Sequence, residues 1–254
     1  MIACLDMYNW PESREIFAAY WQRVHAHLLS QGVNAPATLT VKDEDLRQLA
    51  DDGELLLGQI CGITYARNNA EQQRFTPLGA FICDDDELES GTYCSVLVAK
   101  HGHDIDLNSP EELTAAVNGY GSLSGWIVLA QYFSGQSENT PFSDVLISGS
   151  HRHSAEMVAQ GEADIAALDI ISWTMLERFA PDMTSALKVV GRTPALPGLP
   201  LVTSTHHDAE TIALLKEALY QSMTDPDIQR LMNILGIRGL YDNNPQDYLN
   251  LLSL

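Results

Sequence analysis

The chain has few basic residues: 14 lysines and arginines stand against 34 aspartates and glutamates, which gives a formal net charge of −20 over 254 residues. Proteins that bind nucleic acid need a basic patch that neutralises phosphates, so this composition argues against nucleic acid as a partner. Binding to an anionic membrane surface is disfavoured for the same reason. Any anionic ligand would be held by local hydrogen-bond donors, because the overall field of the protein repels it.

Long apolar runs and a recognisable leader are also missing. No apolar segment approaches the length that spans a bilayer, so we expect no membrane insertion. The start, Met1-Ile-Ala-Cys-Leu-Asp6, lacks the basic region, the long apolar region and the cleavage site of a signal peptide. We therefore expect either a cytoplasmic protein or a periplasmic one from which a leader has been removed.

Cysteines are few and unpaired in sequence. None shows C-x-x-C spacing, and each lies in or beside an apolar strand-like run, which indicates buried reduced thiols. Because their number is even, one disulfide bond is the alternative. The cysteines are Cys4, Cys61, Cys83 and Cys94.

Common signatures of catalysis and nucleotide binding are absent. The chain has no G-x-S-x-G elbow, no P-loop and no dinucleotide fingerprint. Two segments contain metal-ligand residue types: His101-Gly-His-Asp104 with Asp106, and His206-His-Asp208. Neither is accompanied by H-E-x-x-H or by paired C-x-x-C, so we interpret both as solvated loops and expect no metal site.

Strand-like and helical patterns alternate through most of the chain, which predicts an α/β fold with mainly parallel sheets. A self-contained middle segment is flanked by two apolar strand candidates, Tyr93–Lys100 and Leu201–Ser204. We therefore expect two lobes, residues 1–97 plus 201–254 and residues 98–200. Two strands would join them, with a ligand cleft between the lobes.

The most informative stretch is Asn118-Gly-Tyr-Gly-Ser-Leu-Ser-Gly125, which precedes an apolar helix predicted to run from Ser124 to Phe133. Its glycines let the backbone approach a ligand closely, and Ser122 and Ser124 supply hydroxyls. The free N–H groups and the positive dipole end of the helix lie at the same place. Together these features favour a site for phosphate, phosphonate or carboxylate, although an ordinary N-cap serine is the alternative.

Two more strand-to-helix turns in the middle segment carry polar side chains. One is Ser148-Gly-Ser-His151, and the other is Asp169, which precedes a helix predicted over Ile170–Phe179. Ligands of parallel α/β sheets bind at the carboxyl ends of strands, so we expect these turns to converge with the serine turn. As alternatives, His151 could only begin its helix and Asp169 could only cap the next one.

These residues resemble the phosphate/phosphonate-binding proteins of ABC transporters. The opening Leu5-Asp-Met-Tyr8, followed by Pro11 and Glu12, is similar to a subgroup of that family. The resemblance extends to about Ser204 and implies a type II periplasmic-binding-protein fold. The remaining motifs that carry it are, in chain order, Tyr93, Asn118–Gly125, Ser148–His151 and Gly161–Asp169.

The resemblance also implies a set of ligand-binding residues and no cofactor. The serine turn and the histidine would hold the phosphoryl oxygens, and the acidic residue would face the cleft. Tyrosines of the first lobe would close over the ligand, although core packing is the alternative for them. The residues implied are Ser122, Leu123 through its N–H, Ser124, His151, Asp169, Tyr8, Tyr65 and Tyr93.

One position departs from the family pattern, which has Ser-Thr-Ser where this chain has Ser122-Leu123-Ser124. The change removes one hydroxyl donor and adds an apolar side chain. Leaving a phosphoryl oxygen unpaired in a dry site costs about 1–3 kcal/mol. We therefore expect a ligand that is less charged than phosphate or that carries an apolar part.

The predicted function is capture of a small oxyanion, phosphonate-like or phosphate-like, by closure of the two lobes. Its partner, for an exported protein, would be the permease of an ABC transporter. One alternative is an enzyme of the same fold acting on a small metabolite, since Ser150, His151 and Asp169 are residue types found in hydrolases. Another is a cytoplasmic sensing module, which would bind the ligand without a permease.

Overall fold

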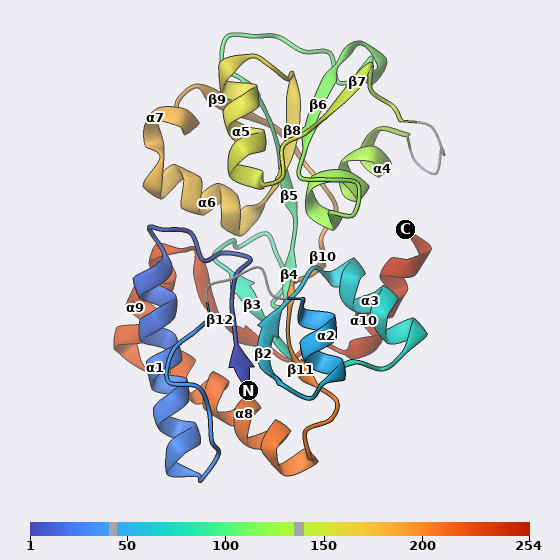
Figure 1. The fold of residues 1–254 in the computed structure, drawn as a ribbon. Coiled ribbons are helices and arrows are strands. Elements are labelled where there is room, and N and C mark those ends of the chain that lie inside the picture. Colours follow the sequence, from blue (N-terminus) through green and yellow to red (C-terminus); the bar gives the residue numbers. More distant parts are fainter. Residues whose placement is uncertain (41–44, 135–139) are drawn as a thin grey trace. The chain divides into compact units, whose positions relative to one another are not determined.

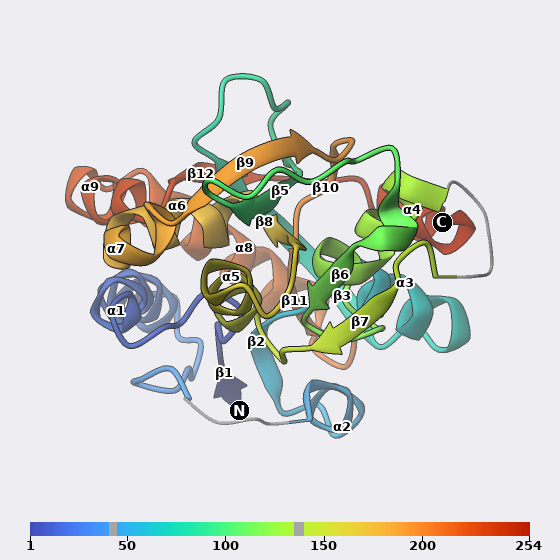
Figure 2. The ribbon, with the colours of Figure 1, turned by 90° about the horizontal axis from the view of Figure 1, so that it is seen from above.

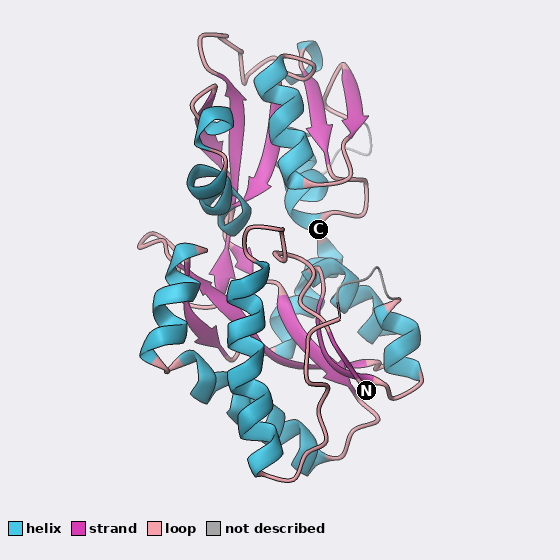
Figure 3. Ribbon diagram, turned by 60° about the vertical axis from the view of Figure 1, so that its left-hand side comes forward, coloured by secondary structure: helices cyan, strands magenta, loops and turns pink. Residues whose placement is uncertain are grey.

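A computed structural model describes residues 1–40, 45–134 and 140–254 (Figure 1). Contacts divide the chain into two units, residues 1–91 with 197–252 and residues 92–196 with 253–254. Each unit contains a five-stranded sheet and several helices, which are magenta and cyan in Figure 3. The contact boundaries lie a few residues before the expected lobe boundaries, and they assign the strand that begins at Ser95 wholly to unit 2.

Unit 1 is built on a sheet of order β1-β2-β11-β3-β12. Its described strands are β1 (Ile2–Ala3), β2 (Leu55–Gln59), β3 (Phe75–Cys83), β11 (Pro200–Ser204) and β12 (Ile237–Tyr241). Its described helices are α1 (Arg14–Ser30), α2 (Leu46–Asp51), α3 (Gly62–Glu71), α8 (Ala209–Met223), α9 (Pro226–Ile234) and α10 (Pro245–Leu249). A final 3₁₀ turn, η3 (Asn250–Ser253), follows α10.

The first helix shows how the sequence builds the core of unit 1. The apolar residues of α1 recur every three to four positions, so they form one face, and that face is buried. The helix packs against α8 and α9. Fully buried Tyr20 reaches across the contact and donates its hydroxyl to the carbonyl of Leu219 in α8, at 3.1 Å.

Unit 2 contains a sheet of order β7-β6-β8-β5-β9. Its described strands are β5 (Ser95–Lys100), β6 (Thr114–Val117), β7 (Asp144–Ile147), β8 (Ile165–Asp169) and β9 (Leu187–Arg192), with β4 (Thr92–Tyr93) and β10 (Leu196–Pro197) near the points where the chain passes between units. Its helices are η1 (Pro110–Glu112), η2 (Leu123–Ile127), α4 (Val128–Ser134), α5 (His151–Gln160), α6 (Ile170–Phe179) and α7 (Pro181–Thr184). Figure 2 shows α5 next to β8, β6 and β5, which it contacts.

The expectation of mainly parallel sheets is wrong, because both sheets are mixed. In unit 2, β6 runs parallel to β7 and β8, whereas β5 is antiparallel to both β8 and β9. In unit 1, β11 and β12 are likewise antiparallel to their neighbours. An alternation of strands and helices predicts parallel pairing only for two strands joined directly by one crossover helix. The antiparallel strands instead join their sheets beside strands that are distant in the sequence.

Cys4, Cys83 and Cys94 are buried, as expected from their apolar surroundings, and Cys61 is partly buried. Within the residues that the structure describes, no helix combines the length and apolarity needed to cross a membrane. The same residues contain no group of three or more histidine, cysteine or acidic side chains arranged to hold a metal ion.

Candidate functional site

The serine turn joins β6 to a helix that begins as a π-helix, η2, and continues as α4. Ser122 is the N-cap, and its Oγ accepts a hydrogen bond from the N–H of Gly125 at 3.0 Å. The N–H groups of Leu123 and Ser124 lie in the first turn, where no earlier helical carbonyl is available to accept them. The turn therefore presents backbone donors and the positive end of the helix dipole together.

Position 125 requires glycine because the side chains of Asn118 and Ser122 lie close to its Cα. A Cβ atom added there would overlap the Oδ1 atom of Asn118 and lie 3.1 Å from the Oγ of Ser122. The side chain of Asn118 thus packs against the start of η2, a contact that the pattern Asn-x-x-x-Ser-x-Ser-Gly did not predict. This contact fixes the serine turn against the end of β6.

Replacing Gly125 with alanine is expected to destabilise the protein by about 1–3 kcal/mol, because the new methyl group must displace Asn118. The measurement is urea denaturation followed by circular dichroism. Gly121→Ala is the matched control, since a Cβ at that glycine meets no atom within 4 Å. Equal stability of the two variants would contradict the proposed fixing of the turn.

The predicted polar residues of unit 2 lie together. The Oγ of Ser124 is 2.8 Å from Nε2 of His151, the first residue of α5. The same Nε2 atom is 3.2 Å from Oδ2 of Asp169, at the end of β8. The Nδ1 atom of His151 is 3.1 Å from the carbonyl oxygen of Ala167, which accepts its hydrogen. Three turns from different parts of the chain thus meet at one imidazole.

Asp169 uses its two carboxylate oxygens differently, and its expected position facing a ligand stays a prediction. One carboxylate oxygen, Oδ1, caps α6 by accepting from the N–H of Ser172 at 3.0 Å. The other oxygen, Oδ2, faces His151. Only 2% of Asp169 is exposed, so its carboxylate acts on the site chiefly through its contact with His151.

Leu123, which was expected to offer its N–H to a ligand, is fully buried, and that role stays a prediction. The preference for a less charged or partly apolar ligand, expected from its side chain, stays a prediction.

Sequence reasoning missed Ser95, which is buried at the start of β5. Its Oγ donates to the carbonyl of Ser124 at 2.9 Å, and its N–H donates to Oγ1 of Thr193 at 2.9 Å. A serine opening an otherwise apolar strand was the available signal.

The protonation of His151 reflects opposing influences. Burial lowers the pKa of His151, whereas the negative charge of Asp169 and the hydrogen bond to Ala167 act to raise it, and burial prevails. The imidazole of the unliganded protein is therefore neutral at pH 7, with its hydrogen on the Nδ1 atom that faces the carbonyl.

This lowered pKa predicts a specific loss of stability in acid. An unfolded histidine has a pKa of about 6.5, so the unfolded chain takes up this proton first as the pH falls. The stability contributed by neutral His151 is fully present above about pH 6.5 and is lost as the pH falls through the folded pKa. Urea denaturation between about pH 7.5 and 5 should therefore show a shallower decline in His151→Gln than in the wild type. The exposed His101 provides the control variant, His101→Gln, and a wild-type decline in both variants would contradict the assignment.

The three predicted tyrosines are buried, and they do not belong to the same unit. Tyr8 and Tyr65 belong to unit 1, whereas Tyr93 lies in β4 of unit 2. Tyr65 packs edge-on against Tyr248 of α10 with ring centroids 5.1 Å apart, and burial raises its pKa. It also lines a cavity of about 240 Å³ with Asn69 and other residues of unit 1. Closure of these tyrosines over a ligand stays a prediction.

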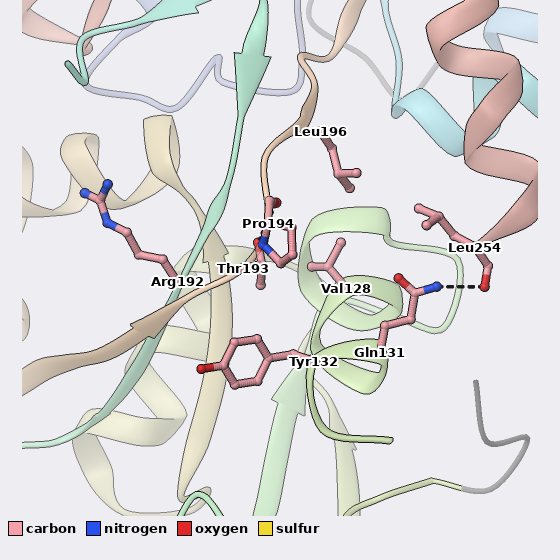
Figure 4. A pocket seen from close by; sticks show the side chains of 8 residues that line it. All are labelled: Val128, Gln131, Tyr132, Arg192, Thr193, Pro194, Leu196 and Leu254. Carbon is pink, nitrogen blue, oxygen red and sulfur yellow. Dashed lines mark hydrogen bonds between the residues drawn. The ribbon is translucent and has the colours of Figure 1, made fainter. Parts of the chain in front are cut away.

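A larger cavity, of about 560 Å³, lies in unit 2 (Figure 4). Figure 4 shows Val128 and Gln131 of α4 and, opposite them, the segment after β9, and Gln131 donates to the carbonyl of Leu254 at 2.7 Å. None of the predicted site residues is among the described residues that line it. The lining residues are Val128, Gln131, Tyr132, Arg192, Thr193, Pro194, Leu196 and Leu254.

Two α/β units with mixed sheets, and a serine turn at the start of a helix, agree with a solute-binding protein of the type II periplasmic-binding-protein fold. The chain belongs to the family described as "ABC transporter, phosphonate, periplasmic substrate-binding protein", whose model matches residues 11–248. The family assignment suggested by the sequence motifs is thereby confirmed. A comparison with curated proteins finds no match.

Solved structures share the fold at low sequence identity. A binding protein component of an ABC phosphonate transporter from Pseudomonas aeruginosa is 18% identical with a TM-score of 0.76, over 99% of this chain and 84% of that one. PhnD1 from Prochlorococcus marinus, in complex with methylphosphonate, is 16% identical with a TM-score of 0.71, over 99% and 96%. XAC2383 from Xanthomonas citri, bound to ATP, is 17% identical with a TM-score of 0.71, over 99% and 95%.

Proposed function

We propose that unit 2 holds the phosphonyl or phosphoryl group of a small oxyanion at the serine turn. The observation that carries this proposal is the contact between Ser124 and His151, 2.8 Å apart, at a helix start whose first N–H groups have no earlier helical carbonyl to bond. The family and the methylphosphonate complex of PhnD1 support the same class of ligand. Residues on two separate turns would thus act on one group of the ligand.

The donors of this turn suit a group that carries several acceptor oxygens. The Oγ of Ser122 uses a lone pair to accept from Gly125, so its O–H remains to donate. The N–H groups of Leu123 and Ser124 add two donors aligned with the helix dipole. Hydrogen bonds to a charged acceptor are about twice as strong as neutral ones, so a few donors suffice without a lysine or arginine.

The enzyme alternative gains no support from this arrangement. In a serine–histidine–aspartate hydrolase, the aspartate binds Nδ1 of the histidine and the serine binds Nε2. Here Ser124 and Asp169 both approach Nε2, while Nδ1 is engaged by the carbonyl of Ala167. Ser150 is used as the N-cap of α5 instead, accepting from the N–H of His153 at 3.2 Å. We therefore propose binding without turnover.

A thermal-shift screen tests the ligand class. The panel holds phosphate, phosphite, methylphosphonate, 2-aminoethylphosphonate, sulfate and small carboxylates. A ligand that binds only the folded state stabilises it by about 2.7 kcal/mol at 100 times its Kd, so we expect a clear rise in Tm with the phosphorus oxyanions. An unchanged Tm across all phosphorus oxyanions would contradict the proposal, whereas carboxylates alone raising the Tm would redirect it.

We also propose that the partner is an ABC permease and that the protein acts outside the cytoplasm, as the family does. The test is cross-linking of the ligand-loaded protein to membranes of its source cell, followed by mass spectrometry. Capture of an ABC permease supports transport. Ligand binding without any permease captured would favour the sensing alternative.

A further inference from the structure

The Nε2 atom of His151 faces two neighbours with opposite requirements. The Nδ1 atom keeps its hydrogen in both protonation states, because the carbonyl of Ala167 can only accept. Any change in protonation must therefore occur at Nε2. That atom lies 2.8 Å from the hydroxyl of Ser124 and 3.2 Å from the carboxylate of Asp169.

The two protonation states direct the hydroxyl hydrogen of Ser124 differently. With neutral His151, the lone pair of Nε2 accepts from the O–H of Ser124, so this hydrogen points at the ring and away from any ligand. The carboxylate of Asp169 then faces a lone pair, which is unfavourable. With protonated His151, Nε2–H donates to Asp169, and the hydroxyl of Ser124 is released to donate elsewhere.

We infer that Asp169 is a positioning residue that makes anion binding proton-linked: one proton from solvent enters His151 at Nε2 as the ligand binds, and Ser124 turns its O–H to the ligand. This inference rests on the proposed function of the serine turn. No covalent bond other than the N–H bond changes, and the proton returns to solvent on release. Such a site favours a fully deprotonated oxyanion, because the ligand itself stabilises the imidazolium.

The charges around α5 agree with this assignment. Helix α5 packs against β5, β6, β8, β9, α6 and α7, and the charge on these elements that acts on the imidazole is that of Asp169. Three other charged groups of these elements have partners elsewhere. Lys100 of β5 donates to the carbonyl of Gln160 at the far end of α5, Lys188 of β9 pairs with Asp104, and Glu177 of α6 is bonded by Trp173.

Asp169→Asn separates the charge from the structural role. Asparagine caps helices about as well as aspartate, so α6 keeps its N-cap while the negative charge beside His151 is removed. The matched control is Asp208→Asn, because Oδ1 of Asp208 caps α8 of unit 1 in the same way, at 2.7 Å from the N–H of Thr211. Both variants replace a capping aspartate with asparagine, but only Asp169 lies beside His151.

The first test needs no ligand. NMR titration of the imidazole resonances, with the His151 signal assigned by its loss in His151→Gln, reports the pKa of His151 directly. We expect Asp169→Asn to lower this pKa by about one unit, corresponding to a tenfold loss of proton affinity, and Asp208→Asn to leave it unchanged. An unchanged or raised pKa in Asp169→Asn would overturn the positioning role.

The second test measures proton uptake by calorimetry with methylphosphonate at about pH 7.5, in buffers of different ionisation enthalpy. The free methylphosphonate has the same ionisation in every experiment, so differences in uptake between variants report on the bound complexes. We expect the wild type and Asp208→Asn to take up close to one proton more than His151→Gln, and Asp169→Asn to bind about tenfold more weakly with an intermediate uptake. Equal uptake by the wild type and His151→Gln overturns the proton link. Absence of any wild-type binding instead overturns the proposed function, and the ligand-free titration still decides the role of Asp169.

Discussion

Replacing Ser124 with alanine is expected to weaken the binding of methylphosphonate by about 10- to 100-fold. The variant removes a hydroxyl that would donate to a charged oxygen, and such hydrogen bonds contribute about 1.5–3 kcal/mol. The fold should persist. Within the described structure, the variant removes one side-chain contact of Ser124, the one with His151. Isothermal titration calorimetry measures the change in Kd.

The matched control for this prediction is Ser143→Ala. Ser143 is also in unit 2, but its Oγ donates to the carbonyl of Leu113, which precedes β6, at 2.8 Å. This variant loses a comparable hydrogen bond at the other end of the strand, so its affinity should match that of the wild type. Wild-type affinity in Ser124→Ala would remove Ser124 from the binding site.

His151→Gln is expected to weaken the same ligand by about 100-fold. The imidazole is the group that can place a positive charge beside the anion, and only 10% of its side chain is exposed. Its removal also leaves the buried carboxylate of Asp169 without its partner, and an unpaired negative charge repels an anion nearby. Affinity measured by calorimetry at about pH 7 should show the loss.

His153→Gln is the control for this second prediction, because His153 lies two residues further along the same helix and is exposed. Its Nδ1 atom contacts the carbonyl of Ser148 at 2.8 Å instead of the serine turn. We expect wild-type affinity in this variant. Equal losses in His151→Gln and His153→Gln would indicate a general effect on α5 and would contradict a direct role of His151.

Short-range signals predicted the local structure around the site. The glycine-serine turn, the helix that follows it and the helix over Ile170–Phe179 could all be predicted, because caps and apolar periodicity act within a few residues. The convergence of Ser124, His151 and Asp169 follows from one general rule, namely that the ends of parallel strands share an edge. The parallel strands β6, β7 and β8 satisfy that rule.

Long-range pairing could not be predicted in the same way. The antiparallel placement of β5 beside β8 joins residues about 70 positions apart, and no local pattern records strand direction. For the same reason, the bond from Ser95 to Ser124 and the packing of Tyr65 on Tyr248 were invisible in the sequence. The cap on α6 by Asp169 could be predicted from its position, whereas its contact with His151 depends on the long-range packing of α5 beside β8.

The central claim is that the serine turn of unit 2 holds the phosphonyl group. A crystal structure of the protein with methylphosphonate tests it most directly. The account predicts phosphonyl oxygens within hydrogen-bonding distance of the Oγ atoms of Ser122 and Ser124 and of the N–H groups of Leu123 and Ser124. Methylphosphonate bound elsewhere, for example in the cavity lined by Val128 and Leu196, with the serine turn free of ligand, would contradict it.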